Sequence, residues 1–252
     1  MFTSSERSSI RSQLVELARA DPAVAGAALV GSAARDEEDD WSDIDLMLQL
    51  APGADEPAVV DAWSAAVSRI GGGTADLLDV DADGVRYRVF FLRSSLQVDL
   101  SFWPHERFRG TGEPFRLLFG APAEPSTSRP VDTGRVIGTG WLYAIHARSA
   151  VARGRVWQAA GMLEELRGAL VTLKCERLGL SSWHGKGVDL LPASDLDELH
   201  RSHPAHITVA ALDTCRRYLT TSFLDEVGRH DAERAGRLAV PFRELVRRVV
   251  GD

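Results

Sequence analysis

The chain has 252 residues, 44% of them hydrophobic and 26% charged, which is typical of a globular protein with a proper core. Its apolar runs are far shorter than the roughly 20 residues of a membrane-spanning helix. The opening MFTSSERSSI also lacks the apolar segment of a secretory signal. The only cysteines, Cys175 and Cys215, are too few for a disulfide framework. We therefore expect no membrane partner, a cytoplasmic location and two buried thiols.

The net charge of −7 is distributed unevenly along the chain. Residues 1–104 contain 18 acidic residues and 8 arginines, a balance of −10, whereas residues 105–252 have a balance of +3. This change predicts two domains. An acidic half is unlike a surface for duplex nucleic acid, which needs basic patches, so no such partner is expected. It suits metal ions or a cationic small molecule, although solubility alone would also explain it.

The first half alternates helical and strand patterns. Thr3 and Glu6 form a capping box at the start of the first helix, and Asp21-Pro22 ends that helix. Gly31 follows the first strand, and SAARD after it can open a helical turn. Asp81-Ala-Asp-Gly84 predicts a hairpin turn. The predicted elements are helices over 4–20 and 57–70 and strands over 24–30, 44–50, 75–80, 85–92 and 96–103.

Residues 104–130 are rich in Pro and Gly and lack periodicity, which predicts loop and linker. From Val131 onward the pattern is helical almost throughout. The sequence therefore predicts a small domain of strands and helices over 1–120 and a helical bundle over 131–252. The predicted helices of the bundle are 131–153, 155–178, 194–202, 206–228 and 232–250.

Two aspartates lie one residue apart at the start of the strand over 44–50. At the period of a strand, Asp43 and Asp45 share one face, and the opposite face is fully apolar. Such carboxylates repel each other and are costly to bury unless they face solvent or a cation neutralises them. Asp99 has the same kind of position on the strand over 96–103. If these strands are neighbours, three hard oxygen ligands converge, as Mg²⁺ chemistry on phosphates requires.

Gly31-Ser32 adds a phosphate-binding part to such a site. Backbone N–H groups at a helix start favour anions such as phosphate. Glycine allows the backbone to approach closely, and the Ser32 hydroxyl adds a donor. Alone, a Gly-Ser pair after a strand is usually a turn; together with the three aspartates it becomes specific.

These residues resemble a known superfamily. VGSAARDEEDDWSDIDLML and the later VDLSFW are similar to the nucleotidyltransferases typified by DNA polymerase beta: Gly-Ser, about ten residues, Asp-x-Asp, then a third Asp on a later strand. The match covers residues 24–104. The second half, chiefly RGRVWQAAGMLEELRGALVTLKCERLGL with HGKGVDLLP, resembles more loosely the bundle of aminoglycoside and lincosamide adenylyltransferases. The resemblance implies an α+β fold: a polymerase-beta-like catalytic domain with a mixed sheet and flanking helices, then the bundle.

The resemblance also implies roles for individual residues. Asp43 and Asp45 would hold two Mg²⁺ ions and, through one of them, the triphosphate of ATP or another NTP. Asp99 would complete the second metal site and help to remove the proton of the attacking hydroxyl. The nucleotide-binding residues expected in this way are Gly31, Ser32, Arg35, Ser42 and Lys186. The reaction would transfer NMP to a hydroxyl of a small molecule, for example an aminoglycoside antibiotic in a resistance enzyme, and release pyrophosphate.

Several residues have two interpretations. Lys186, between glycines, is either a cation that reaches the triphosphate or an exposed loop lysine, and Lys174 is expected on a helix surface. Glu164 or Glu165 is the candidate general base, and the alternative is an ion pair of Glu164 with Arg167 on a solvated face.

Other polar residues are weaker candidates. Arg35 either contacts a phosphate or balances the acidic loop. Glu37-Glu38-Asp39-Asp40 is most simply a solvated loop, although it could also attract a cationic substrate. His200, His203 and His206 are spaced for zinc, but Pro204 should prevent a helix from aligning them.

Two other functions compete with this assignment. Small antitoxins of the same superfamily bind and modify a protein partner, and a non-catalytic nucleotide-binding module would keep the fold without the reaction. The sequence leaves open the acceptor, the preferred NTP, the general base and the oligomeric state.

Overall fold

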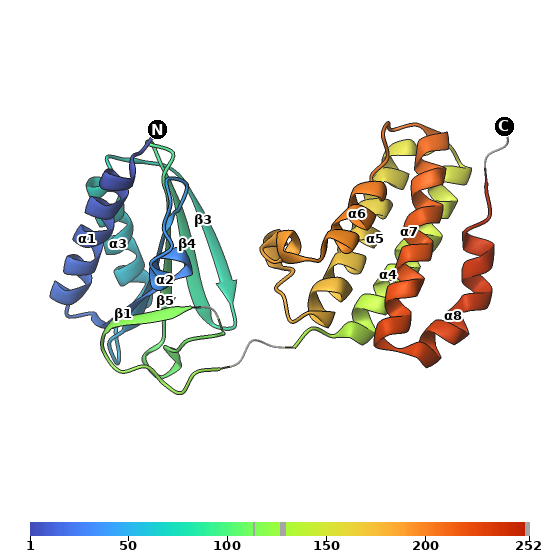
Figure 1. Cartoon of the computed structure of the whole chain (residues 1–252). Helices are drawn as coiled ribbons and strands as arrows, with labels where there is room; N and C mark the ends of the chain where they lie inside the picture. The colour runs from blue at the N-terminus through green and yellow to red at the C-terminus, as the bar shows by residue number, and fades with distance from the viewer. Residues whose placement is uncertain (113, 127–129, 250–252) are drawn as a thin grey trace. The chain divides into compact units, whose positions relative to one another are not determined.

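The computed structural model describes residues 1–112, 114–126 and 130–249 (Figure 1). The chain divides into two compact units, Met1–Arg129 and Pro130–Asp252. The first is built around a mixed sheet with helices, and the second is helical in its described part. The α+β class predicted from the sequence is therefore confirmed.

The first unit contains a six-stranded sheet in the order β3-β4-β5-β2-β1-β6. Strands β2 and β5 pair in parallel, and every other neighbouring pair is antiparallel. The elements are α1 (Ser4–Ala20), β1 (Val24–Val30), α2 (Gly31–Arg35), β2 (Ile44–Leu50), α3 (Glu56–Ile70), β3 (Thr74–Ala82), β4 (Val85–Leu92), β5 (Gln97–Trp103), the 3-10 turn η1 (His105–Arg107) and β6 (Phe115–Phe119).

Local signals account for most of these boundaries. Both hydrogen bonds of the predicted capping box are present between Thr3 and Glu6, so two otherwise unpaired N–H groups of α1 are satisfied. The turn between β3 and β4 places Asp83 at φ +50° and Gly84 at φ +69°. Two consecutive left-handed residues give a hairpin the twist of its flanking strands, which is why Asp-Gly occurs there.

Strand β6 corrects the prediction of loop and linker over 104–130. Phe115 pairs with Val30, and Phe119 with Ala27, along the edge strand β1. The segment FRLLF is short and lies between residues rich in Gly and Pro, so its own periodicity is too weak to predict a strand. Its conformation depends on backbone pairing with residues about 90 positions earlier in the chain, which local propensity does not report.

Helices α1 and α3 cover one face of the sheet (Figure 1). The apolar row of β2 faces them and is almost fully buried, as are Leu14 of α1 and Trp63 of α3. Arg88 of β4 donates to the Ser64 hydroxyl of α3 at 2.8 Å. The core therefore lies between the helices and the sheet, and this fixes which face of β2 and β5 remains for other chemistry.

The second unit is a helical bundle in its described part (Figure 1). Leucines and alanines of α4, α5 and α7 form its core, together with Phe223 of α7 and Phe242 of α8. The elements are α4 (Thr133–Ala152), α5 (Val156–Arg177), η2 (Trp183–Gly185), η3 (Val188–Leu190), α6 (Ala193–Arg201), α7 (Val209–His230) and α8 (Ala232–Leu245).

Lys174 corrects the expectation of a surface lysine. Its side chain is fully buried, and Nζ lies 2.5 Å from both Asp195 Oδ1 and Glu198 Oε2 of α6. Glu226 of α7 is 3.8 Å away, and its other oxygen accepts a bond from Arg177 Nε at 2.6 Å. These acids come from two helices far along the sequence, so the helical pattern around Lys174 could not reveal them.

Both cysteines are free and buried, as predicted. Within the described residues, no helix combines the length and the apolar character that crossing a membrane requires.

Candidate metal centre

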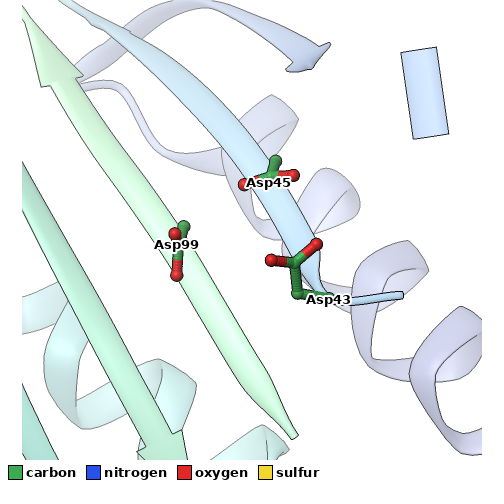
Figure 2. A group of neighbouring side chains, drawn as sticks. All are labelled: Asp43, Asp45 and Asp99. Atoms are coloured by element: carbon green, nitrogen blue, oxygen red, sulfur yellow. The ribbon is translucent and has the colours of Figure 1, made fainter. Parts of the chain in front are cut away.

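Three carboxylates meet on the face of the sheet that α1 and α3 leave uncovered. Asp45 of β2 and Asp99 of β5 are register partners in the parallel pairing, and Asp43 immediately precedes β2. Each offers an oxygen, and these oxygens lie within 4.8 Å of one another (Figure 2). The convergence of three aspartates predicted from strand periodicity is confirmed.

The backs of the same strands hold these side chains in place. Ile44 and Val98, which alternate with the aspartates, are completely buried against the helical layer, and they too are register partners. A shift of one residue in either strand would exchange its apolar row with its acidic row. The core therefore fixes the register, and the register places Asp45 beside Asp99.

The electrostatics of the cluster favour a bound cation. Burial raises the pKa of Asp99 to about 6, hydrogen bonding by Gln97 opposes this, and the charge of Asp43 adds to it. Gln97 Nε2 donates to Asp99 Oδ1 at 3.0 Å and lies 3.5 Å from Asp43 Oδ2. The exposed amide of Gln97 thus bridges two of the three acids.

Gly31 is required at its position for two reasons. Its φ is +63°, a conformation that side chains with a β-carbon rarely adopt. In addition, a β-carbon built there would overlap Oδ2 of Asp45. The glycine therefore allows the start of α2 to approach the carboxylate directly, and the next residue, Ser32, lies in the same short helix.

The donor set fits a hard divalent cation. Carboxylate oxygens are the ligands that Mg²⁺ and related ions prefer. A cation among these oxygens would relieve both the mutual repulsion of the acids and the cost of desolvating Asp99. Among the described residues, the three aspartates are the only group of at least three His, Cys, Asp or Glu side chains placed closely enough to hold a metal ion. The three histidines His200, His203 and His206 form no such group.

The loop that leads to Asp43 is anchored more firmly than its composition indicates. Arg7 of α1 is 3% exposed, and its guanidinium donates to the backbone oxygens of Asp39 and Ser42. Glu38 forms an ion pair with Arg11 and lies 3.4 Å from Arg7 Nε. The expectation of a simply solvated acidic run is therefore wrong for Glu38. Arg7 was not among the predicted site residues, although its helical spacing from Ile10 and Leu14 places it on the buried face of α1.

Two predicted phosphate ligands are engaged elsewhere. Arg35 forms an ion pair with Glu37, which agrees with its alternative role of balancing the acidic loop. The Ser42 hydroxyl donates to Asp39 Oδ1 at 2.9 Å and accepts from the Asp39 backbone N–H at 2.9 Å. These contacts close the loop just before Asp43.

The remaining candidates lie in the second unit. Glu164 forms the expected ion pair with Arg167, and its side chain is 70% exposed. The pair is not on a fully solvated face, however, because Arg167 is buried and donates to Ser202 Oγ at 2.9 Å and to Ser202 O at 2.7 Å. Glu164 and Glu165 line a cavity of about 420 Å³ between α4, α5 and the residues around Gly185. Lys186 follows η2 and is exposed.

Comparisons with known proteins give little further information. No family model matches the chain, and no curated protein matches it. Among solved structures, it is similar to an aminoglycoside 6-adenyltransferase from Bacillus subtilis with a TM-score of 0.38 and 12% sequence identity, over 95% of this chain and 98% of that one. A similarity at this level establishes neither the family nor the substrate of the chain.

Proposed function

We propose that the chain is a metal-dependent nucleotidyltransferase, which transfers NMP, with ATP as the first donor to test, to a hydroxyl group of a small molecule. The observation that supports this most is the meeting of Asp43, Asp45 and Asp99 on two parallel neighbouring strands. Three rigidly held carboxylates with room for a backbone approach at Gly31 suit a reaction at a metal-bound triphosphate.

The proposed reaction is an in-line displacement. The acceptor hydroxyl oxygen forms a bond to the α-phosphorus, the bond from that phosphorus to the bridging oxygen of the β-phosphate breaks, and pyrophosphate leaves. Asp99 is the candidate to accept the hydroxyl proton, because its carboxylate lies within the acidic cluster at which the acceptor hydroxyl would bind. The rest of the contribution of the protein is to position the reactants.

Asp43, Asp45 and Asp99 would hold Mg²⁺, with two ions expected. Bound Mg²⁺ supplies charge neutralisation at the attacking and leaving oxygens. Gly31 and Ser32 would bind the β- and γ-phosphates through the backbone at the start of α2 and the Ser32 hydroxyl.

The other proposed site residues lie outside the cluster of three aspartates. Arg35 and Ser42 would have to exchange their bonds with Glu37 and Asp39 for bonds to phosphate. Lys186 is exposed and would bind the triphosphate as a mobile cation, and Glu164, exposed at the rim of a cavity, is the alternative to Asp99 as the general base.

The test is pyrophosphate release across a panel of NTPs and hydroxyl-bearing compounds, with Mg²⁺ or with EDTA. We expect Mg²⁺-dependent release with at least one pair, abolished by Asp43→Asn and unchanged by Asp61→Asn, an exposed aspartate of α3. Nucleotide binding without release against any acceptor would indicate a non-catalytic module instead. Transfer of radiolabel from ATP to a co-purifying protein would indicate an antitoxin-like enzyme.

A further inference from the structure

The first unit also contains a cavity. It opens on the same face of the sheet as the three aspartates, toward the end of β5 and the start of β4. It has a volume of about 400 Å³ and lies between the β3–β4 turn and the segment that follows β5. The lining residues that matter for its chemistry are Asp83, Tyr87, Trp103, Arg107, Arg109 and Thr111.

The sheet register relates this cavity to the acids. Val89 of β4 is opposite Asp99, and Tyr87 is opposite Ser101. Asp99, Ser101 and Trp103 alternate along β5 and so point to one face. At about 3.3 Å per residue, Tyr87 is roughly 7 Å along the strands from Asp99, and Trp103 roughly 13 Å. A small molecule roughly 13 Å long can therefore contact the cavity lining and the aspartates at the same time.

One wall of the cavity is aromatic and rigid. The rings of Tyr87 and Trp103 meet edge to face, with centroids 6.5 Å apart. The Trp103 indole N–H donates to the buried Ser101 hydroxyl at 2.9 Å, which fixes the ring. A tyrosine hydroxyl is protonated at neutral pH, and burial raises the pKa of Tyr87 further, so this hydroxyl can donate a hydrogen bond.

Two arginines, Arg107 and Arg109, also line the cavity. A β-carbon on Gly84 would lie 2.5 Å from Arg107 Nη1, so the glycine of the turn makes room for Arg107. Within the described part of the chain, no carboxylate is within ion-pair distance of Arg107. Arg109 donates to the backbone oxygens of Arg107 and Glu106, both at 3.2 Å. Among the described residues that line the cavity, Asp83 is the one acid that faces these two cations.

We propose that this cavity holds the far end of the acceptor, and that the acceptor is an alcohol with a planar ring and a carboxylate. This inference rests on the proposed function. The carboxylate would pair with Arg107 and the ring would pack on Tyr87 and Trp103, while the hydroxyl reaches the aspartates. A polycationic acceptor would instead meet the two guanidinium groups, which disfavours the cationic substrate expected from net charge.

Three probes that share one hydroxyethylphenyl group and carry a negative, a neutral or a positive group at the other end test the inference: 4-(2-hydroxyethyl)benzoate, the corresponding benzamide and 4-(2-hydroxyethyl)benzylamine. With ATP and Mg²⁺, we expect kcat/KM for pyrophosphate release to be about tenfold higher for the benzoate than for the amide, and lowest for the amine. Arg107→Gln should remove the preference, mainly through KM for the benzoate. Arg93→Gln, an exposed arginine in the β4–β5 turn, is the matched control and should retain it.

Calorimetric binding of the benzoate, without nucleotide, separates this inference from the proposed function. Binding that Arg107→Gln weakens about tenfold supports the cavity, even if no probe releases pyrophosphate, in which case the proposed function alone fails. Equal binding to Arg107→Gln, no binding at all, or a preference for the amine overturns the inference. So does a loss of ATP affinity in Arg107→Gln, because the cavity would then belong to the nucleotide.

Discussion

Asp45 and Asp99 are direct partners across the parallel pairing of β2 with β5. Both strands run in the same direction, so the residues at their starts, Asp43 and Gln97, also come together at one end of the site. Neighbouring strands are about 4.8 Å apart, which brings like charges close enough to repel strongly. The arrangement therefore costs free energy in the absence of a cation.

Mg²⁺ should stabilise the wild-type protein through this cluster. A ligand that binds only the folded state at about 100 times its Kd adds about 2.7 kcal/mol to the free energy of unfolding. We expect saturating Mg²⁺ to raise the Tm in differential scanning calorimetry, and Asp43→Asn to abolish the rise. If the variant responds to Mg²⁺ as the wild type does, the ion binds elsewhere.

Asp99→Asn should stabilise the metal-free protein at pH 8. Because the folded-state pKa of Asp99 is raised from 3.8 to about 6, its charge at pH 8 is less favourable in the folded than in the unfolded chain. Removing the charge should add on the order of 1 kcal/mol, less than the full shift implies because the carboxylate is partly exposed. Urea unfolding at pH 8 in EDTA measures this. The gain should shrink as the pH falls through 6, where the wild-type carboxyl takes up its proton.

Gly31→Ala should disrupt the site through a steric contact. The new β-carbon would overlap Asp45 Oδ2, in addition to the strain of a positive φ. Gly53→Ala is the matched control, because Gly53 has φ +78° but nothing within 4 Å of its added β-carbon. We expect both variants to lose about 1 kcal/mol from backbone strain. Only Gly31→Ala should also lose the Mg²⁺-dependent rise in Tm, and equal behaviour of the two would contradict the close approach.

Arg7→Met should loosen the loop that carries Asp43. Arg7 is buried and donates to the backbone oxygens of Asp39 and Ser42, so its loss removes one donor from each carbonyl, and the Asp39 oxygen keeps only the Ser42 N–H at 3.4 Å. We expect a loss of roughly 2 kcal/mol in the free energy of unfolding and faster hydrogen exchange over residues 36–43. Arg19→Met, on the same helix with a half-exposed side chain, is the control. Unchanged exchange in Arg7→Met would show that the loop is held by other contacts.

Lys174→Met should be strongly destabilising at neutral pH and less so in acid. The change removes the cation that pairs with Glu198 and one of the cations of Asp195, which keeps Arg177, while Glu226 keeps Arg177 and Arg229; breaking a buried pair costs about 3–5 kcal/mol. Lowering the pH would protonate Asp195 and Glu198 and recover part of the loss. Chemical unfolding from pH 4 to 8 tests this, and a loss that does not depend on pH would argue against the network.

In the wild-type protein, by contrast, the contribution of this network to the free energy of unfolding falls in acid. Burial opposes the charged forms of Asp195 and Glu198, but hydrogen bonds from Lys174 lower both pKa values below 3.8 and 4.5, respectively. Their contribution to stability is therefore present above those values and is lost as the pH falls through the lowered pKa values. Burial likewise opposes the charge of Lys174, but Asp195 and Glu198 raise its pKa above 10.5, so its contribution is lost only as the pH rises past that value.

Strand periodicity, helix capping and turn residues determined the position of the acidic cluster and several element boundaries from the sequence alone. The alternation of β2 and β5 placed Asp43, Asp45 and Asp99 on the faces opposite to apolar rows, and burial of those rows left the acids little freedom. The capping box of α1 and the Asp-Gly turn of β3–β4 are local as well, because each depends on neighbours within a few positions.

Only the tertiary structure decided the features that depend on distant partners. Strand β6 exists through its pairing with β1, Lys174 is buried because α6 and α7 bring acids to it, and Arg7 holds a loop more than 30 positions away. The cavity around Arg107 forms where the β3–β4 turn meets the segment after β5. The physical reason is common to all four: a polar or short segment gains its favourable contacts only after the chain has folded, so its local pattern does not reveal them.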